Sequence, residues 1–170
     1  MKKYLLIAAL MMTAAITFTS CGSDDEPKEK VTATATYNLS LSQDLLDACN
    51  VFITYKAENG RNVKDKITTT WWSQSITSDK FPAEFGVKFE FSPKSLAELT
   101  KDQYNLTSEL NMNIKTSKGA NYTNSFTIID SQNVSKDKVV STLEKKSGTS
   151  VGFKVSKDGI PTPNNNLNYD

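Results

Sequence analysis

Strict alternation of apolar and polar side chains marks the start of the folded part of this sequence. From Val31 to Leu41 every second residue is apolar, and threonine, asparagine and serine fill the positions between. Successive side chains of a strand point to opposite faces of a sheet, so this pattern predicts a half-buried strand. The pattern recurs from Phe85 to Phe91 and from Tyr104 to Ile114. The last stretch is long enough that we expect a bend or bulge within it.

Further strands are predicted by β-branched and aromatic runs bounded by turn residues. Val51–Tyr55 is such a run, and Asn59-Gly60 after it has the composition of a type I′ hairpin turn. The returning strand is expected over Val63–Trp71. Two more strands are expected over residues 121–129, after the Ser117-Lys118-Gly119 turn, and 151–155.

Two segments carry helical signals instead. Ser95 and Glu98 have capping-box spacing, which predicts a short helical connection before Tyr104. Ser135 is placed to cap a second helix, and Gly148 is placed to end it. We therefore expect one or two short helices between the strands.

About seven strands without a β-α-β rhythm predict an all-β fold, an antiparallel sandwich of two sheets. Leu99, the turn after it, Tyr104 and Leu106 resemble the tyrosine corner of immunoglobulin and fibronectin type III domains. The resemblance is short; it implies an immunoglobulin-like architecture and transfers no function. We expect one domain over residues 31–157, and a loosely ordered tail over 158–170, which has two prolines and no periodicity.

The N-terminus has the order of parts that a signal peptide requires. Lys2 and Lys3 precede an apolar run from Leu5 to Ile16, which is too short for a membrane span. Small residues then lead to Cys21, and this junction resembles the bacterial lipobox, with Phe18 in the place of the usual leucine. The resemblance implies cleavage after residue 20 and a lipid on Cys21; the alternative is an ordinary secretory signal followed by an incidental cysteine.

Acidic residues follow the predicted anchor directly. Ser23, Asp24, Asp25 and Glu26 resemble the export signal by which Bacteroidota-type lipoproteins reach the outer face of the outer membrane. The resemblance implies a lipid-anchored protein of the outer membrane, at the cell surface. The alternative is a solvated spacer, and in both cases residues 21–30 form a flexible tether without large apolar side chains.

Charge and cysteine content exclude further classes. Loss of Lys2 and Lys3 with the signal peptide changes the formal net charge from +1 to −1, and Arg61 is the single arginine. Such a chain lacks the basic surface of a nucleic-acid-binding protein. With Cys21 lipidated, Cys49 has no partner for an intramolecular disulfide, and we expect it to be a small buried apolar residue.

The residues offer little support for catalysis or metal binding. The sequence contains no histidine, which removes the commonest general base and zinc ligand. Ser92/Lys94 and Ser135/Lys136 are chance neighbours in a lysine-rich chain. Asp44 and Asp47, or Asp24 and Asp25, lack the spacing of a calcium loop. Nothing selects a catalytic pair among the carboxylates of Glu84, Glu90, Glu98 and Glu109.

Trp71-Trp72 is the most suggestive pair in the sequence. Adjacent strand residues point to opposite faces, so only one of the two indoles can enter the core. An exposed indole is a platform for a sugar ring or a partner's side chain. The alternative is that the second indole covers a sheet edge or packs beneath the later helix.

The sequence therefore favours a non-enzymatic, lipid-anchored binding or adhesion module for extracellular glycan or protein. It implies no cofactor and no metal, and its membrane contact would be the N-terminal lipid. A structural or assembly subunit of an outer-membrane complex is the alternative from another class. A small hydrolase is the second alternative.

Overall fold

The computed structural model describes residues 30–164 and 166–169. The elements, in chain order, are the following: β1 (Ala33–Leu41), α1 (Gln43–Ala48), β2 (Cys49–Lys56), β3 (Asn62–Ile67), β4 (Trp71–Ser78), β5 (Ala83–Pro93), β6 (Gln103–Thr116), β7 (Asn121–Ser135), the 3-10 turn η1 (Lys136–Lys138), α2 (Val139–Glu144), β8 (Ser150–Val155) and β9 (Pro161–Pro163). The predicted signal peptide, Cys21 and the acidic segment Ser23–Glu26 lie outside the described residues.

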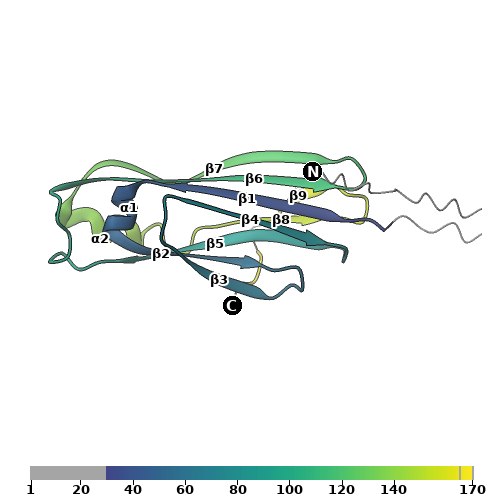
Figure 1. The fold of residues 1–170 in the computed structure, drawn as a ribbon, viewed down its shortest axis with the longest axis horizontal. Coiled ribbons are helices and arrows are strands. Elements are labelled where there is room, and N and C mark those ends of the chain that lie inside the picture. The colour runs from purple at the N-terminus through teal and green to yellow at the C-terminus, as the bar shows by residue number, and fades with distance from the viewer. Residues whose placement is uncertain (1–29, 165, 170) are drawn as a thin grey trace, which may run out of the picture.

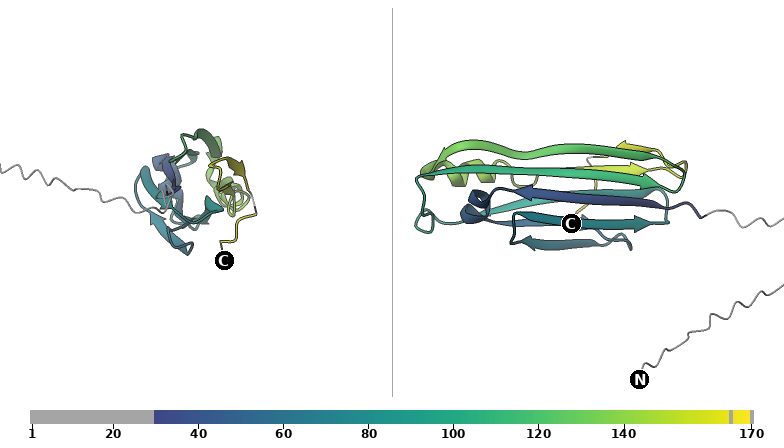
Figure 2. Two further views of the ribbon diagram at one scale, coloured as in Figure 1. Left: turned by 90° about the vertical axis from the view of Figure 1, so that its right-hand side faces the viewer. Right: turned by 45° about the horizontal axis from the view of Figure 1, so that its top comes forward.

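The strands form two antiparallel sheets packed face to face (Figures 1 and 2). One sheet has the order β4-β1-β6-β7 and the other has the order β3-β2-β5-β8-β9. The strands run along the long axis, with α1 and α2 together at one end (Figure 1). The predicted all-β, antiparallel two-sheet sandwich with short helices is confirmed, with nine strands in the described chain.

Alternating burial within the strands builds the core between the sheets. β1 is buried at every second residue over its nine positions, as the sequence predicted. β6, beside β1 in the same sheet, adds a second inward row, and the middle of β5 supplies the facing layer with Phe85, Val87 and Phe89. Each strand of the four-stranded sheet thereby turns one row of side chains inward and another toward solvent.

The segment after the first hairpin divides into two strands. The prediction of one strand over Val63–Trp71 is wrong, because β3 ends at Ile67 and β4 begins at Trp71 in the opposite sheet. Thr68–Thr70 connects the two sheets, and the Thr70 carbonyl accepts a hydrogen bond from Leu41 N–H at 2.9 Å. This connection consists of three threonines, which favour strands, so the sequence contains no turn residue that marks the crossing.

The first hairpin also differs from its prediction. Gly60 has a φ of 79°, whereas Asn59 does not have the positive φ that a type I′ turn needs. Gly60 N–H donates to the Ala57 carbonyl at 2.8 Å, and Asn59 Oδ1 accepts from Arg61 N–H at 3.0 Å. The loop is thus a type I turn closed by a left-handed glycine, which Asn59 favours through its side-chain bond.

The long strand β6 was predicted to contain a bend or bulge, and the irregularities in its pairing lie on the partner strand β7 instead. The pairing of β6 with β7 shifts between Ser108 and Glu109 and again between Tyr104 and Leu106. At the first shift Ile128 of β7 is the extra residue, and at the second Asn133 takes a φ of 52°. Such bulges bend the bulged strand and increase its local twist.

The connection from β5 to β6 contains the predicted tyrosine corner. Tyr104 is buried, and its Oη accepts a hydrogen bond from Lys101 N–H at 3.0 Å. The capping-box contact also forms, since Ser95 N–H donates to Glu98 Oε2 at 2.9 Å. It closes a turn and not the predicted helix.

The C-terminal tail, for which the sequence predicted a loosely ordered segment over 158–170, packs on the sandwich in the described residues. Pro161–Pro163 pairs with β8 as β9, and Leu167 is only 8% exposed. The tail lies on Gly86 and Gly152, where any Cβ would come within 2.7 Å of Leu167 Cδ1. Two glycines paired across β5 and β8 therefore form the cavity that Leu167 fills. Between residues 30 and 169, where placed, no helix is long and apolar enough to cross a membrane.

Candidate functional site

The two tryptophans separate as the alternation predicted. Trp71 is 56% exposed on the outer face of the four-stranded sheet. Trp72 points inward and packs against the core, with its ring centroid 5.6 Å from that of Tyr55. Trp71 therefore offers the more open indole surface to solvent, whereas Trp72 is partly buried.

Strand pairing places Trp71 in a row with three polar residues. Ser40 of β1 is paired with Trp71 of β4 and with Glu109 of β6, and Glu109 is paired with Thr127 of β7. Directly paired residues share a face and have Cβ atoms roughly 5 Å apart. The row therefore contains an indole, a hydroxyl, a carboxylate and a second hydroxyl across the whole width of the sheet.

Three further rows lie on this outer face beyond the first, and every one of their side chains is polar. We call the four rows together the outer polar face. Its members are Trp71, Ser40, Glu109 and Thr127 in the first row; Ser73, Asn38, Asn111 and Ser125 in the second; Ser75, Thr36, Asn113 and Thr123 in the third; and Thr77, Thr34, Lys115 and Asn121 in the fourth. Glu109 and Lys115 are its only charged residues, although charged residues make up 23% of the chain.

Hydrogen bonds between neighbouring strands order this face. The hydroxyl groups of Thr34 and Thr77 lie 2.9 Å apart, as do those of Thr36 and Ser75. Ser73 Oγ donates to Asn38 Oδ1 at 2.8 Å. Each of these side chains keeps further donor or acceptor capacity toward solvent. The result is a pre-formed lattice of uncharged hydrogen-bonding groups.

A hollow of about 350 Å³ opens at the first row, next to the Ile128 bulge. Ser40, Ser42, Thr107, Glu109, Thr127 and Asp130 line it, and Leu41, Ser108 and Ile129 lie between them along the three strands. Ser108 is only 3% exposed, and among the described residues its Oγ has no hydrogen-bond partner. A serine at a core position of β6 is a departure from the apolar alternation on that strand.

Two carboxylates reach this hollow from different strands. Glu109 Oε1 accepts a hydrogen bond from Ser125 Oγ, and Asp130 Oδ1 accepts one from Gln132 Nε2 at 2.9 Å. A carboxylate has about four acceptor positions, so each group retains capacity for a ligand. The hollow can thus accept several hydrogen bonds from hydroxyl or ammonium groups.

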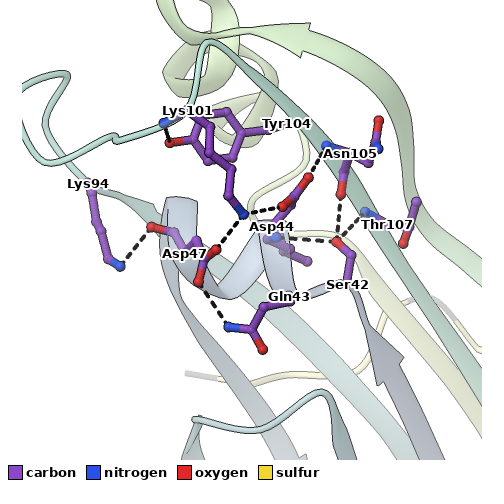
Figure 3. A network of polar contacts seen from close by, with 10 residues as sticks. Ser42, Gln43, Asp44, Asp47, Lys94, Lys101, Tyr104, Asn105 and Thr107 are labelled. Carbon is purple, nitrogen blue, oxygen red and sulfur yellow. Dashed lines mark hydrogen bonds and ion pairs between the residues drawn. The ribbon is translucent and has the colours of Figure 1, made fainter.

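One wall of the hollow is held by Ser42, which caps α1 (Figure 3). Ser42 Oγ donates to the Asn105 carbonyl at 2.7 Å. It accepts from the amides of Leu45 and Thr107 at 3.2 and 3.1 Å. The Ser42 hydroxyl therefore lies just after the end of β1, caps the first turn of α1 and bonds to the backbone of β6. These bonds fix the position of Thr107.

Lys101 lies between the two aspartates of α1 (Figure 3). Its Nζ is 2.6 Å from Asp44 Oδ1 and 2.8 Å from Asp47 Oδ2. The Asn105 amide, followed by Lys101, lowers the pKa of Asp44, and Lys101 and then Gln43 lower that of Asp47. The ammonium occupies the position that a cation would need, so these aspartates anchor α1 to the β5–β6 connection.

The remaining candidates for chemistry lie apart from the hollow. Cys49 is buried, its Sγ–H donates to the Leu45 carbonyl at 3.3 Å, and burial raises the pKa of its thiol to about 12. Glu90 forms an ion pair with Lys64, and Glu98 closes the Ser95 turn. No group of three metal-ligating side chains occurs within the placed residues, and Asp24 and Asp25 lie outside them.

The sequence pattern singled out Trp71 but did not select Glu109, and it contained no signal for Ser40, Thr127 and Asp130. Only the register across four strands shows that these residues share one surface. A comparison with the sequence profiles of protein families finds no match for this chain, and a comparison with curated proteins finds none either.

Proposed function

We propose that the protein is a non-enzymatic binding module for extracellular glycan, held at the outer membrane by a lipid on Cys21. The observation that carries the proposal is the row of Trp71, Ser40, Glu109 and Thr127 beside the hollow. It combines an exposed aromatic platform with convergent polar groups, as small-molecule sites commonly do. Binding would not require a conformational change, because strand pairing already forms the surface.

The dimensions of the row suit a short stretch of sugar chain. Trp71 and Glu109 are separated by two strand spacings, or roughly 10 Å between backbones. A sugar ring stacked on the indole would place the next ring over Ser40 and Glu109. The apolar face of the first ring would contact the indole, and the hydroxyl groups of the second would donate to the carboxylate.

The charges indicate which glycans are favoured. The hollow presents two carboxylates, Glu109 and Asp130, and Lys115 lies in the fourth row, away from them. Sulfated or carboxylated sugars would meet like charge there, whereas neutral and amino sugars would not. We therefore propose neutral or amino sugars as the ligand class.

A glycan panel titrated with wild-type protein and with Trp71→Ala tests the proposal. We expect at least about tenfold weaker binding for Trp71→Ala, because an indole at the centre of a contact commonly contributes this much. Ile160→Ala is the matched control, since Ile160 is 60% exposed and lies outside the outer polar face. Absence of any bound glycan, or equal binding by Trp71→Ala and wild type, contradicts the proposal.

The same titrations distinguish binding from hydrolysis. Two carboxylates in one hollow are also the minimum for glycoside cleavage. Bound glycans are therefore analysed for shortened products after prolonged incubation. Cleavage that disappears in Glu109→Gln would replace the binding proposal with the hydrolase alternative.

The anchor is tested separately in cells. Growth with labelled palmitate should label the wild-type protein and not Cys21→Ser, and added protease should digest the wild-type domain on intact cells. Labelling of both proteins, or of neither, contradicts the lipid on Cys21. Protection from protease contradicts the surface location.

A further inference from the structure

The four edges of the two sheets differ in how they are protected against pairing with another strand. β3 carries Lys64, Asp65 and Lys66, and β9 consists of three residues with a proline at each end. β7 carries two register shifts and Asp130. Charges, prolines and bulges are the devices by which natural sheets prevent edge-to-edge association.

β4 has none of these devices. Its sequence, WWSQSITS, contains no charged residue and no proline. All eight of its residues pair with β1 in one uninterrupted register. Among the edges in the described part of the chain, β4 is thus the flat and unprotected one, and its free backbone groups can form a further ladder.

We propose that β4 pairs antiparallel with β4 of a second copy of this chain, about a two-fold axis at Gln74. Paired residues must share a face, and this axis places Trp71 opposite Thr77 and Ser73 opposite Ser75 on the outer side. On the inner side it places Trp72 opposite Ile76, which is a favourable aromatic and β-branched pair. The two Gln74 amides then face each other and can exchange hydrogen bonds.

A second copy meets no charge repulsion along this edge, and the strand is complementary to itself. No like charges meet along the paired strands, and beyond them Asp79 and Lys80 fall opposite Thr69 and Thr68. A self-pairing interface must be complementary to itself, and an uncharged strand with polar outer and apolar inner residues meets this condition. The two four-stranded sheets would join into one of eight strands.

The pairing extends the outer polar face without covering it, because the second sheet is added in the plane of the first. Trp71 would change from an edge position to one between Ser40 and the partner's strand. Two copies of the first row would then lie on one continuous surface, which increases avidity for a repeating ligand. The inference stands without the proposed glycan function, since it concerns the backbone edge of β4.

The test measures molar mass by light scattering and sedimentation over a concentration series of roughly 10 µM to 1 mM, a range suited to a weak dimer. Wild type should approach the dimer mass at high concentration. Ser73→Lys with Ser75→Lys, and separately Ser73→Glu with Ser75→Glu, should remain monomeric, since like charges become opposed. An equimolar mixture of the lysine and glutamate variants should recover the dimer.

The control places the same charge on the opposite edge of the same sheet, as Asn121→Lys with Thr123→Lys on β7, and should dimerise like wild type. Circular dichroism and melting temperature confirm that each variant is folded. A monomeric wild type at the highest concentration overturns the proposal, as does dimerisation of either β4 variant alone. Failure of the mixture to recover the dimer also overturns it. If a β4 variant does not fold, Gln74→Glu replaces it, with the same expected loss because the two carboxylates at position 74 would face each other across the axis.

Discussion

The two sheets of this sandwich turn very different surfaces to solvent. The outer side of the four-stranded sheet carries three charged residues, Glu109, Lys115 and Asp130. The outer side of the five-stranded sheet carries seven, namely Lys56, Lys64, Lys66, Glu84, Lys88, Glu90 and Lys154. The latter sheet is also covered at Gly86 and Gly152 by the C-terminal tail.

The difference in charge indicates that the five-stranded sheet has a surface suited to solubility, whereas the four-stranded sheet has one suited to binding. Dispersed lysine and glutamate side chains keep a surface hydrated and discourage association. A face of serine, threonine and asparagine around one indole is less costly to desolvate and offers directional hydrogen bonds. The covered sheet stabilises the fold, and the uncovered sheet is the better candidate for function.

The strongest test of the covered sheet is Gly152→Ala. Its Cβ would come within 2.4 Å of the Asn164 carbonyl oxygen and 2.6 Å of Leu167 Cδ1. Displacing the tail should lower the free energy of unfolding by about 2 kcal/mol, measured by urea denaturation. In a chain that ends after Pro163, the same substitution should cost much less, and an equal cost in both chains would show that the tail is not what Gly152 accommodates.

Ser108→Ala gives the next largest effect, of opposite sign. It removes a buried hydroxyl that has no hydrogen-bond partner among the described residues, so the free energy of unfolding should rise by about 1 kcal/mol. Chemical denaturation measures this change, and glycan titration of the same variant shows whether the hollow keeps its affinity. A loss of stability would indicate that the hydroxyl has a partner in solution.

Lys101→Met should change the response to acid. The folded-state pKa values of Asp44 and Asp47 are depressed, so their contribution to stability is present above about pH 4, their unfolded-state pKa, and is lost as pH falls through the lower folded values. Wild type should therefore lose more stability than Lys101→Met between pH 6 and pH 3, as followed by urea denaturation. Identical losses would show that the ion pairs do not fix α1.

Thr36→Ala should have the smallest effect on folding. Thr36 lies on the outer polar face and shares one exposed hydrogen bond with Ser75. The free energy of unfolding should change by less than about 0.5 kcal/mol, as is usual for surface positions. Thermal denaturation checks this, and a change of several degrees in melting temperature would mean that the polar lattice also holds the sheet together.

Local pattern predicted the strands well but not their neighbours. Alternation identified β1, β5 and β6, because a half-buried strand leaves a period of two in the sequence. It could not identify the first row, since Ser40, Trp71, Glu109 and Thr127 come from four strands and only long-range pairing aligns them. The tail escaped prediction because Leu167 is buried by two glycines, which carry no hydrophobic signal of their own.

The length of β1 determines how far the first row lies from the start of the sandwich. β1 begins at Ala33, and Ser40 of the first row follows seven residues later, roughly 23 Å further along a rigid strand. The indole and the hollow therefore lie near the end of β1 that is remote from the proposed lipid anchor on Cys21, and the length of the sandwich itself separates them from the point where the chain enters the fold.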